Sequence, residues 1–277
     1  MKIDNIAISV DMEDWFHGII SYNNSRLRQQ DLENRFVFST QNMLNFFSER
    51  KIKATFFVLG SLAEKAPGLI REIQSAGHEV ASHGWSHQLV YNMTPSEFER
   101  DIDMAKKKLE DIVQEPVLGY RAPYFSITNR SLWAPSIIES VGYRYDSSIS
   151  SFKNFIYGIK NTPRFYYFLS KNLLEIPPSC LNIAGFNIPW TGGLYFRVLP
   201  YFLIQNGIKK ISKNGKGTMM YFHTADFDLN QPNAECSFLE RFIHYAGLKS
   251  LPSKMDKLFT DFRVYPIQDV YSEILCR

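Results

Sequence analysis

Two histidines four residues apart are the most informative candidates for chemistry in this chain. His83 and His87 follow a short apolar run, in the segment Gly77-His78-Glu79-Val80-Ala81-Ser82-His83-Gly84-Trp85-Ser86-His87. If this turn is helical, both imidazoles lie on one face and can bind a single ion. Neutral imidazole suits zinc, cobalt, nickel or iron, and a catalytic metal usually has a third protein ligand and an open position for water.

An acidic segment upstream can supply the third ligand. Alternating Ile6, Ile8 and Val10 predict a strand that runs directly into Asp11-Met12-Glu13-Asp14. Strand alternation places Glu13 on the same face as Asp11. Acidic residues after a strand often serve instead as helix caps. Glu13 and Asp14 both stay candidates for the ligand. Two histidines and a carboxylate outline a hydrolytic metal site.

The composition is that of a soluble globular protein. The 277 residues are 45% hydrophobic and 21% charged, which is enough for one large α/β domain with a full core. Basic and acidic residues nearly balance (31 against 28), and the longest basic run is Lys106-Lys107-Lys108, so no electrostatic footprint for nucleic acid is present. The aromatic content of 15% suits either a bulky core or a groove whose rings stack on sugars.

The beginning of the chain and its apolar stretches bear on location. Met1-Lys2-Ile3-Asp4-Asn5 leads directly into the first predicted strand, which leaves no room for a secretory signal. The apolar runs are too short for an integral membrane segment. We therefore expect a cytoplasmic protein, with a peripheral position at a membrane also open. The sequence does not indicate the oligomeric state.

Strand and helix patterns alternate along the chain. Helix signals start at Ser39 or Thr40, and a capping box, Thr94-Pro95-Ser96-Glu97, opens a strongly amphipathic helix. Further helices are predicted over 67–76, 131–141 and 199–212 and within 238–262, and strands over 6–10, 54–58, 79–81, 143–145 and 218–222. This order predicts an α/β fold with barrel-like spacing and one domain over residues 1–277, with an aromatic-rich insertion around 154–171.

The ordered motifs resemble one protein family. Asp11-Met12-Glu13-Asp14, Gly77 to His87, Gly119-Tyr120-Arg121-Ala122-Pro123-Tyr124 and Tyr221-Phe222-His223 together resemble the polysaccharide deacetylases of carbohydrate esterase family four. The later part is similar to a subgroup associated with exopolysaccharide and exosortase loci. Its signs are Ile188-Pro189, Gly192-Gly193-Leu194-Tyr195-Phe196-Arg197, Leu199-Pro200-Tyr201 and Asp261-Phe262-Arg263.

The resemblance implies a fold and a reaction. The fold is a distorted or incomplete (β/α) barrel of seven or eight strands. The reaction is the metal-dependent removal of the N-acetyl group from a sugar of a surface polysaccharide or its precursor, which releases acetate and leaves a free amine. Zinc is the expected metal, with cobalt, nickel or iron as alternatives. The partner is the N-acetylated sugar or glycan.

The resemblance also implies residue roles. Asp11 is the expected general base, and His223 is the general acid that protonates the departing amine. Arg121 is expected to grip Asp11, and the backbone N–H of Tyr124 to stabilise the oxyanion. The expected metal ligands are His83, His87 and one of Asp14 and Glu13. The expected substrate-binding residues are Pro123, Trp190, Gly193 and Tyr195.

Two departures from the family pattern leave questions open. Family members usually have adjacent aspartates after the first strand, whereas this chain has Asp11, Glu13 and Asp14. The subgroup tends to have Pro-Trp-Glu after the last histidine, whereas Thr224-Ala225-Asp226 stands here. The carboxylate partner of His223 therefore stays open among Asp146, Asp226 and Asp228. Two other functions also stay open, an amidohydrolase of small cyclic amides or ureides and a non-catalytic glycan-binding module.

Overall fold

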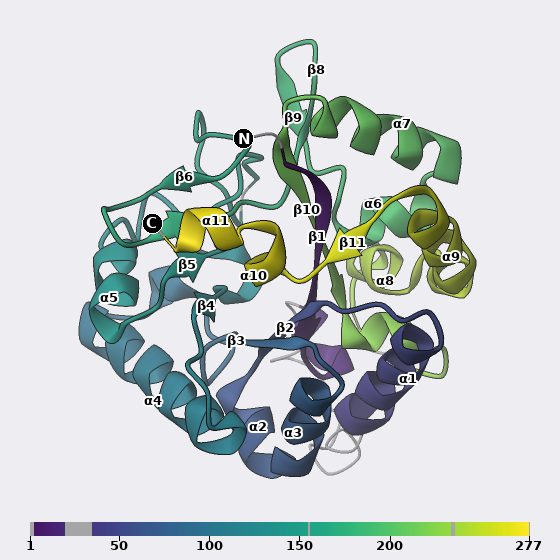
Figure 1. Cartoon of the computed structure of the whole chain (residues 1–277). Helices are drawn as coiled ribbons and strands as arrows, with labels where there is room; N and C mark the ends of the chain where they lie inside the picture. The colour runs from purple at the N-terminus through teal and green to yellow at the C-terminus, as the bar shows by residue number, and fades with distance from the viewer. Residues whose placement is uncertain (1–2, 20–34, 155, 234–235, 277) are drawn as a thin grey trace.

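The computed structural model describes residues 3–19, 35–154, 156–233 and 236–276. One curled sheet organises this part of the chain, with strand order β10-β1-β2-β3-β4-β5-β7-β6 and with β11 paired to β1 (Figure 1). Its strands are β1 (Ile3–Met12), β2 (Thr55–Val58), β3 (Glu79–Ser82), β4 (Gly119–Tyr120), β5 (Tyr145–Asp146), β6 (Tyr167–Phe168), β7 (Leu174–Glu175), β10 (Lys216–His223) and β11 (Val264–Tyr265).

The sheet curls into an incomplete barrel, as predicted. Neighbouring strands from β10 to β7 run parallel, and β6 is antiparallel to β7. The segment after β7 returns to β10, where Ser179 N–H donates to the Met219 carbonyl (3.2 Å) and Tyr221 N–H to that of Thr191 (3.3 Å). This segment carries a small separate sheet of β8 (Leu181–Ile183) and β9 (Phe186–Ile188). Irregular backbone therefore links the two ends of the curl.

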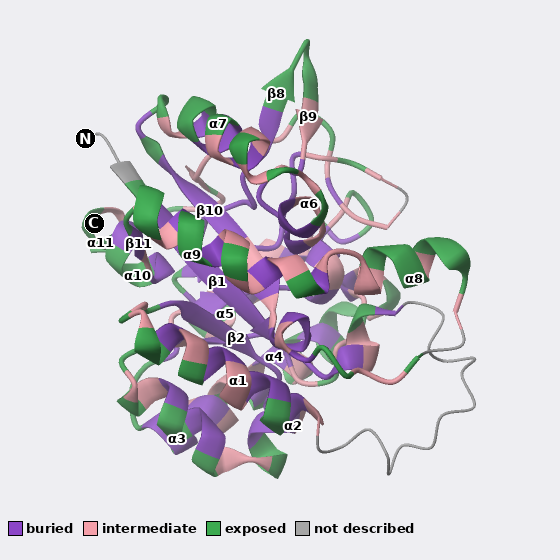
Figure 2. Cartoon of the chain, turned by 90° about the vertical axis from the view of Figure 1, so that its right-hand side faces the viewer, coloured by how far each residue is buried: buried purple, intermediate pink, exposed green. Residues whose placement is uncertain are grey.

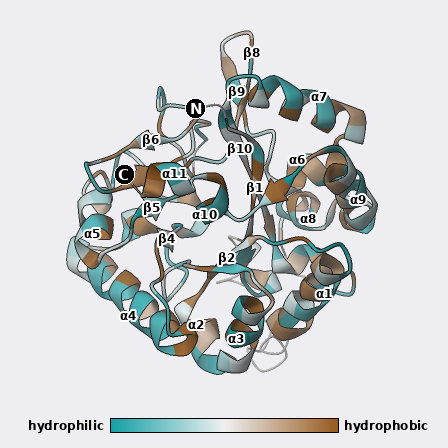
Figure 3. Ribbon diagram, viewed as in Figure 1, coloured by the Kyte–Doolittle hydropathy of each residue, from teal (hydrophilic) through white to brown (hydrophobic). Residues whose placement is uncertain are grey.

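Helices cover the outside of the sheet. They are α1 (Arg35–Glu49), α2 (Gly60–Lys65), α3 (Pro67–Ser75), α4 (Pro95–Val113), α5 (Ala134–Val141), α6 (Gly193–Val198), α7 (Tyr201–Ser212), α8 (Phe238–Tyr245), α9 (Leu251–Asp261), α10 (Ile267–Val270) and α11 (Ser272–Leu275). The predicted capping box at α4 is present, since the Thr94 side chain accepts from Glu97 N–H and Glu97 accepts from Thr94 N–H. Hydrophilic and hydrophobic residues alternate along α4 (Figure 3). Figure 2 shows the exposed faces of these helices, and α8 has no buried residue.

Several predicted boundaries need correction. Ser39 and Thr40 do not cap the first helix but lie inside α1, where both are buried and Ser39 Oγ donates to the Phe36 carbonyl (3.2 Å). The helix expected over 199–212 is α7, which begins two residues later at Tyr201, and Leu199 and Pro200 separate it from α6. The segment predicted as an insertion, 154–171, contains β6 and is otherwise without regular structure in its described residues. The single-domain extent stays a prediction.

The two ends of the curled sheet differ in what covers them. Ala7, Phe57 and Ala81 form a buried cluster on the face opposite Ile8 and Val10. At the end where β2 and β3 begin, α10 caps the sheet, because Ile267 N–H donates to Thr55 Oγ1 (2.7 Å) and Gln268 N–H to Glu79 Oε2 (3.0 Å) (Figure 1). The chemistry-bearing residues therefore gather at the other end, where the parallel strands finish. Among the described residues, no helix combines the length and apolar character that crossing a membrane requires.

Candidate active site

Strand register brings the predicted residues to one rim. Asp11 at the end of β1 lies beside His223 at the end of β10. His83 and Arg121 follow β3 and β4, whose ends are paired through Ser82 and Tyr120. Because neighbouring parallel strands end at the same edge, residues more than 200 positions apart in sequence converge there.

Glu13, His83 and His87 form a candidate metal-binding group. Glu13 Oε1 lies 2.8 Å from His83 Nε2 and 2.9 Å from His87 Nε2. His83 Nδ1 donates to the Arg121 carbonyl (2.7 Å), because a carbonyl oxygen can only accept. The Nε2 lone pair of neutral His83 therefore faces a carboxylate oxygen. Two lone pairs at this separation need a proton or a metal ion between them, and a carboxylate with two imidazoles is a donor set that fits a divalent metal ion.

The charge state of Glu13 agrees with this arrangement. Burial by itself raises the pKa of Glu13, but His87 and then His83 outweigh it and hold the pKa well below its usual range. A deprotonated carboxylate and two imidazole nitrogens are suitable ligands for zinc and neighbouring transition metals. The third predicted ligand is thus available as an anion.

The histidines do not reach each other through a helical turn, and that expectation is wrong. β3 ends at Ser82, and His87 lies in a loop with a left-handed φ of 56°. Asp101 on α4 holds this loop, accepting from Trp85 N–H at 2.7 Å and from Ser86 N–H at 3.1 Å. Sequence reasoning missed Asp101, because nothing in its spacing connects it with the histidines.

Asp14 is not in the metal-binding group. Its carboxylate accepts from Trp15 N–H (2.8 Å) and caps the short 3-10 helix Trp15–Gly18, while Asp14 N–H donates to His17 Nδ1 (3.0 Å). Burial raises the pKa of Asp14 to about 7. The sequence left two acids open as the third ligand. The structure brings Glu13 to the histidines, whereas Asp14 caps a helix, the structural role also considered for this segment.

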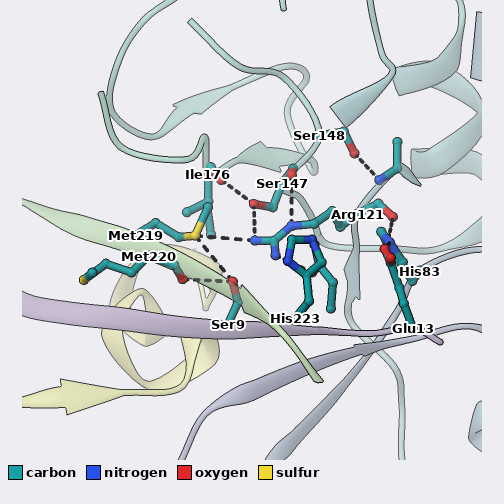
Figure 4. Close-up of polar contacts among 12 residues, drawn as sticks. Ser9, Glu13, His83, Arg121, Ser147, Ser148, Ile176, Met219, Met220 and His223 are labelled. Carbon is teal, nitrogen blue, oxygen red and sulfur yellow. Dashed lines mark hydrogen bonds and ion pairs between the residues drawn. The ribbon is translucent and has the colours of Figure 1, made fainter. Parts of the chain in front are cut away.

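Arg121 holds Asp11, as expected, and does so through one hydrogen bond. Its Nη1 donates to Asp11 Oδ1 (2.6 Å), and its other nitrogens donate to Ser147 Oγ (3.0 Å) and the Ser147 carbonyl (3.3 Å). The guanidinium is fully buried and lies 4.0 Å from the ring centroid of Phe57. Figure 4 shows its contacts with Ser147 and Met219. Because Ser147 takes the second arm, Asp11 Oδ2 is left for other partners.

Asp226 is the carboxylate partner of His223. It accepts from His223 N–H (3.0 Å), lies 3.8 Å from His223 Nδ1 and pairs with Arg197 (3.3 Å). Burial by itself lowers the pKa of His223, but Asp226, Glu13 and Asp11 raise it to about 9. The Nε2 atom of His223 lies 3.9 Å from Asp11 Oδ2. Asp228 instead binds Arg35 (2.6 Å), so this candidate is excluded by geometry.

Asp146, the third candidate partner, has a different neighbour. The register of β5 and β7 places it beside Glu175, and both are fully buried. Burial raises the pKa of both carboxyl groups, to about 7 for Asp146. Among the described residues, Asp146 Oδ2 and Glu175 Oε2 have no other hydrogen-bond partner. A proton shared between the two carboxyl groups would make them partners of each other. Ser148 links this pair to the backbone N–H of Ala122 (2.7 Å), beside Arg121.

Pro123 and Tyr124 shape the loop after β4. Pro123 opens a short 3-10 helix, and Tyr124 has a left-handed φ of 55°. The Tyr124 ring lies 5.1 Å from the His87 ring, and its hydroxyl donates to the His17 carbonyl. The Tyr124 side chain therefore stands next to the candidate metal ligands, while the oxyanion role of its backbone N–H stays a prediction.

The three later substrate-binding candidates separate in space. A Cβ on Gly193 would lie 3.2 Å from Asp226 Oδ2, so Gly193 permits the close approach of the carboxylate that serves His223. Tyr195 is half-buried and contributes, after burial, to the raised pKa of Tyr157. Trp190 packs against Gly207 of α7, where a Cβ would overlap the indole ring. Trp190 is half-buried, and its substrate-binding role stays a prediction.

Two family models match the chain. Residues 33–145 match the model described as polysaccharide deacetylase. Residues 147–272 match a domain of unknown function, DUF3473. The first range contains the histidines and Arg121, and the second contains His223 and Asp226. The sheet draws strands from both ranges.

Curated relatives match over shorter stretches. A Bacillus cereus peptidoglycan-N-acetylglucosamine deacetylase is 33% identical over 30% of this chain and 39% of its own length. Chitin deacetylase 1 of Cryptococcus neoformans is 29% identical over 33% of this chain and 19% of its own length. An uncharacterized 30.6 kDa protein of Geobacillus stearothermophilus is 28% identical over 38% of this chain and 39% of its own length. The chain thus matches about two fifths or less of these relatives.

Solved structures share the fold over nearly the whole chain. A Mycobacterium smegmatis protein provisionally assigned as a polysaccharide deacetylase superposes with a TM-score of 0.66 at 17% identity, covering 99% of this chain and 91% of its own. A pseudoenzyme of carbohydrate esterase family four from Bacillus anthracis superposes with a TM-score of 0.52 at 11% identity. This match covers 96% of this chain and 65% of the pseudoenzyme chain. The fold therefore occurs with and without activity. The similarity to polysaccharide deacetylases thus rests on the family model matched by residues 33–145, and the solved structures share the fold.

Proposed function

We propose that this protein is a metal-dependent N-deacetylase acting on an N-acetylated sugar of a surface polysaccharide or of its precursor. One observation carries the proposal: a carboxylate and two imidazoles converge within 2.9 Å beside Asp11 and His223. Amide hydrolysis needs an activated water, a stabilised oxyanion and a proton for a poor amine leaving group. The rim supplies candidates for each need.

The metal-binding group is the first of these candidates. Glu13, His83 and His87 would hold the ion, and zinc is the metal that this donor set favours. When bound there, a divalent ion lowers the pKa of a water and polarises the acetyl carbonyl. The Arg121 carbonyl fixes the tautomer of His83 through Nδ1, which leaves Nε2 to face the ion.

Asp11 is the candidate general base. Arg121 holds its Oδ1, so the orientation of the carboxylate is set before substrate arrives. Its Oδ2 faces the metal-binding group and His223, since Asp11, Glu13 and His223 have ligand atoms within 4.8 Å of one another. Asp11 can therefore take the proton of the attacking water, provided that Arg121 stays in place.

His223 is the candidate general acid. Asp226 supports the protonated imidazole, and Arg197 in turn holds Asp226. The raised pKa of His223, about 9, keeps the ring charged near neutral pH. A charged imidazole that is about a third exposed can pass its proton to the departing sugar amine, which otherwise leaves poorly.

Acetate release tests this proposal. Metal-loaded protein is assayed on chitooligosaccharides, peptidoglycan fragments and N-acetylated sugar precursors. We expect acetate from at least one of them, and a fall of ~10²–10⁴-fold in kcat for Asp11→Asn and for His223→Gln, since each removes a proton-transfer group. Asp103→Asn, an exposed change on α4, serves as the matched control and should leave kcat unchanged.

Two outcomes would contradict the proposal. Absence of acetate from every substrate, with metal bound, would remove the deacetylase function. A protein that binds glycan and keeps all measurable function as Asp11→Ala would be a binding module instead of a hydrolase. Hydrolysis of small cyclic amides or ureides in place of sugars would favour the other amidohydrolase reaction.

A further inference from the structure

A cavity of about 150 Å³ lies at the same rim as the proposed active site. Its lining comes from three successive loops, those that follow β3, β4 and β5. Because these strands are parallel, the three loops lie on the same rim as the metal-binding group. The residues that carry its chemistry are Tyr91, Asn129, Arg130, Lys153, Asn154 and Tyr157.

Side-chain contacts connect the cavity to the site. The Tyr157 ring lies 6.1 Å from the ring of Phe125, which follows Tyr124 directly in the chain. Phe125 in turn packs 4.8 Å from Tyr221, and the Tyr221 ring lies 5.9 Å from that of His223. On the other wall, Tyr91 contributes to the raised pKa of Tyr124, after burial and nearer charges. These rings therefore connect the lining of the cavity with the ring of His223.

The cavity is positively charged. Arg130 and Lys153 are both exposed lining residues, and neither has an ion-pair partner within the described part of the chain. The described lining residues include no carboxylate. The Arg130 guanidinium lies 4.5 Å from the Tyr91 ring centroid, and its Nη2 donates to the Tyr91 carbonyl (3.5 Å). Tyr91 thus orients Arg130 without neutralising it.

The remaining polar groups of the cavity mainly donate. Asn154 Oδ1 accepts from the backbone N–H groups of Ile156 and Tyr157, at 2.8 Å each. Its acceptor is thereby engaged, so its amide NH₂ is left for a ligand. Thr128 Oγ1 likewise accepts from Arg130 N–H (3.3 Å). A cavity with two unpaired cations and free amide donors is complementary to an anion.

We propose that this cavity is a subsite for an anionic group of the substrate, either a carboxylate on the sugar next to the N-acetylated one or the phosphate of a sugar precursor. The inference rests on the proposed function, because the active site fixes where the N-acetylated sugar lies. It narrows the substrate class from N-acetylated glycans in general to acidic glycans or phosphate-bearing precursors. A neutral chain of N-acetylglucosamine would leave Arg130 and Lys153 without partners.

Matched oligosaccharides test this subsite. One tetrasaccharide alternates N-acetylglucosamine with glucuronic acid, the second has glucose in place of glucuronic acid, and UDP-N-acetylglucosamine forms a phosphate arm. For the double variant Arg130→Gln/Lys153→Gln we expect KM to rise ~10-fold on the anionic substrate that the native protein prefers. Its kcat on that substrate and its KM on the neutral tetrasaccharide should stay unchanged. The phosphate arm shows which anion the cavity recognises.

The matched control removes the same charge elsewhere. Arg100→Gln/Lys209→Gln changes two exposed cations on α4 and α7 and should leave KM unchanged on every substrate. A KM that the Arg130/Lys153 variant leaves unchanged on both anionic substrates, or changes equally on the anionic and the neutral ones, would overturn the subsite.

A binding measurement separates this proposal from the proposed function. Calorimetry of the acidic tetrasaccharide with the two double variants needs no turnover. If no acetate is released but the Arg130/Lys153 variant alone binds more weakly, the subsite stands and the hydrolase proposal fails. If acetate is released and the two double variants bind equally well, the hydrolase proposal stands and the subsite fails.

Discussion

Two buried glutamates at opposite ends of the curled sheet have opposite surroundings. Glu79, at the start of β3, accepts from Thr55 Oγ1 (2.5 Å), Tyr145 Oη (2.6 Å) and Gln268 N–H (3.0 Å). These donors are neutral, and burial, followed by the nearby Asp269 carboxylate, raises the pKa of Glu79. Glu13, after β1, faces two imidazoles, and its pKa is held well below its usual range although burial opposes this.

The difference teaches how neighbours assign a role to the same side chain. Neutral hydroxyl and amide donors satisfy the oxygens of Glu79 and join α10 to the sheet, so its oxygens are fully used within the protein. The nearest partners of Glu13 are imidazole nitrogens, which satisfy its carboxylate only when they carry a proton or share a metal ion with it. Burial alone does not distinguish a structural glutamate from a ligand, because both are about 5% exposed.

The largest expected effect comes from exchanging the two glutamates for glutamine. Glu13→Gln should lower kcat/KM by ~10²-fold or more, because metal-based stabilisation is worth several kcal/mol. Its melting temperature should stay near that of the native apo-protein. Glu79→Gln should keep kcat/KM and bound metal. Acetate assays and metal analysis of both variants check this contrast, and equal loss of activity in the two would break it.

The next effect is on stability at the closed end. Tyr145→Phe removes a donor to buried Glu79 and should lower the free energy of unfolding by ~1–3 kcal/mol. Tyr271→Phe is the matched control, since that buried tyrosine makes only a 3.5 Å contact with the Lys216 carbonyl. Urea unfolding measures both. A larger loss for Tyr271→Phe than for Tyr145→Phe would refute the donor role assigned to Tyr145.

The pH dependence of stability sharpens the comparison further. Burial raises the pKa of folded Glu79 above its ordinary value of 4.5, so the folded state holds its proton longer than the unfolded chain does. This contribution is fully present below pH 4.5 and is lost as the pH rises toward the folded-state pKa. Glu79→Gln cannot ionise and should lose less stability over that range. Parallel pH slopes of unfolding free energy in the two proteins would contradict this prediction.

The smallest expected effect is at Asp14. Asparagine caps a helix about as well as aspartate, so Asp14→Asn should change the unfolding free energy by no more than ~0.5 kcal/mol. The metal content should stay that of the native protein. Metal analysis checks it directly. Loss of metal from Asp14→Asn with metal kept by Glu13→Gln would reverse the assignment of the third ligand.

The strand ends were predictable from the sequence because parallel strands finish on one edge. Asp11, Arg121 and His223 each follow an apolar run, so their meeting needed only the order of the strands. The choice between Glu13 and Asp14 depended on where β1 stops, which alternation alone does not set. His87 depended on a loop fixed by Asp101, a contact without a local signal. The carboxyl pair of Asp146 and Glu175 required the exact register of two short strands.

Diffraction at the absorption edge of the bound metal is the most direct test of the central claim. In crystals of the metal-loaded protein, we predict one anomalous peak ~2.0–2.2 Å from His83 Nε2, His87 Nε2 and a carboxylate oxygen of Glu13. A peak on Asp14, or no peak at this rim in protein that releases acetate, would contradict it.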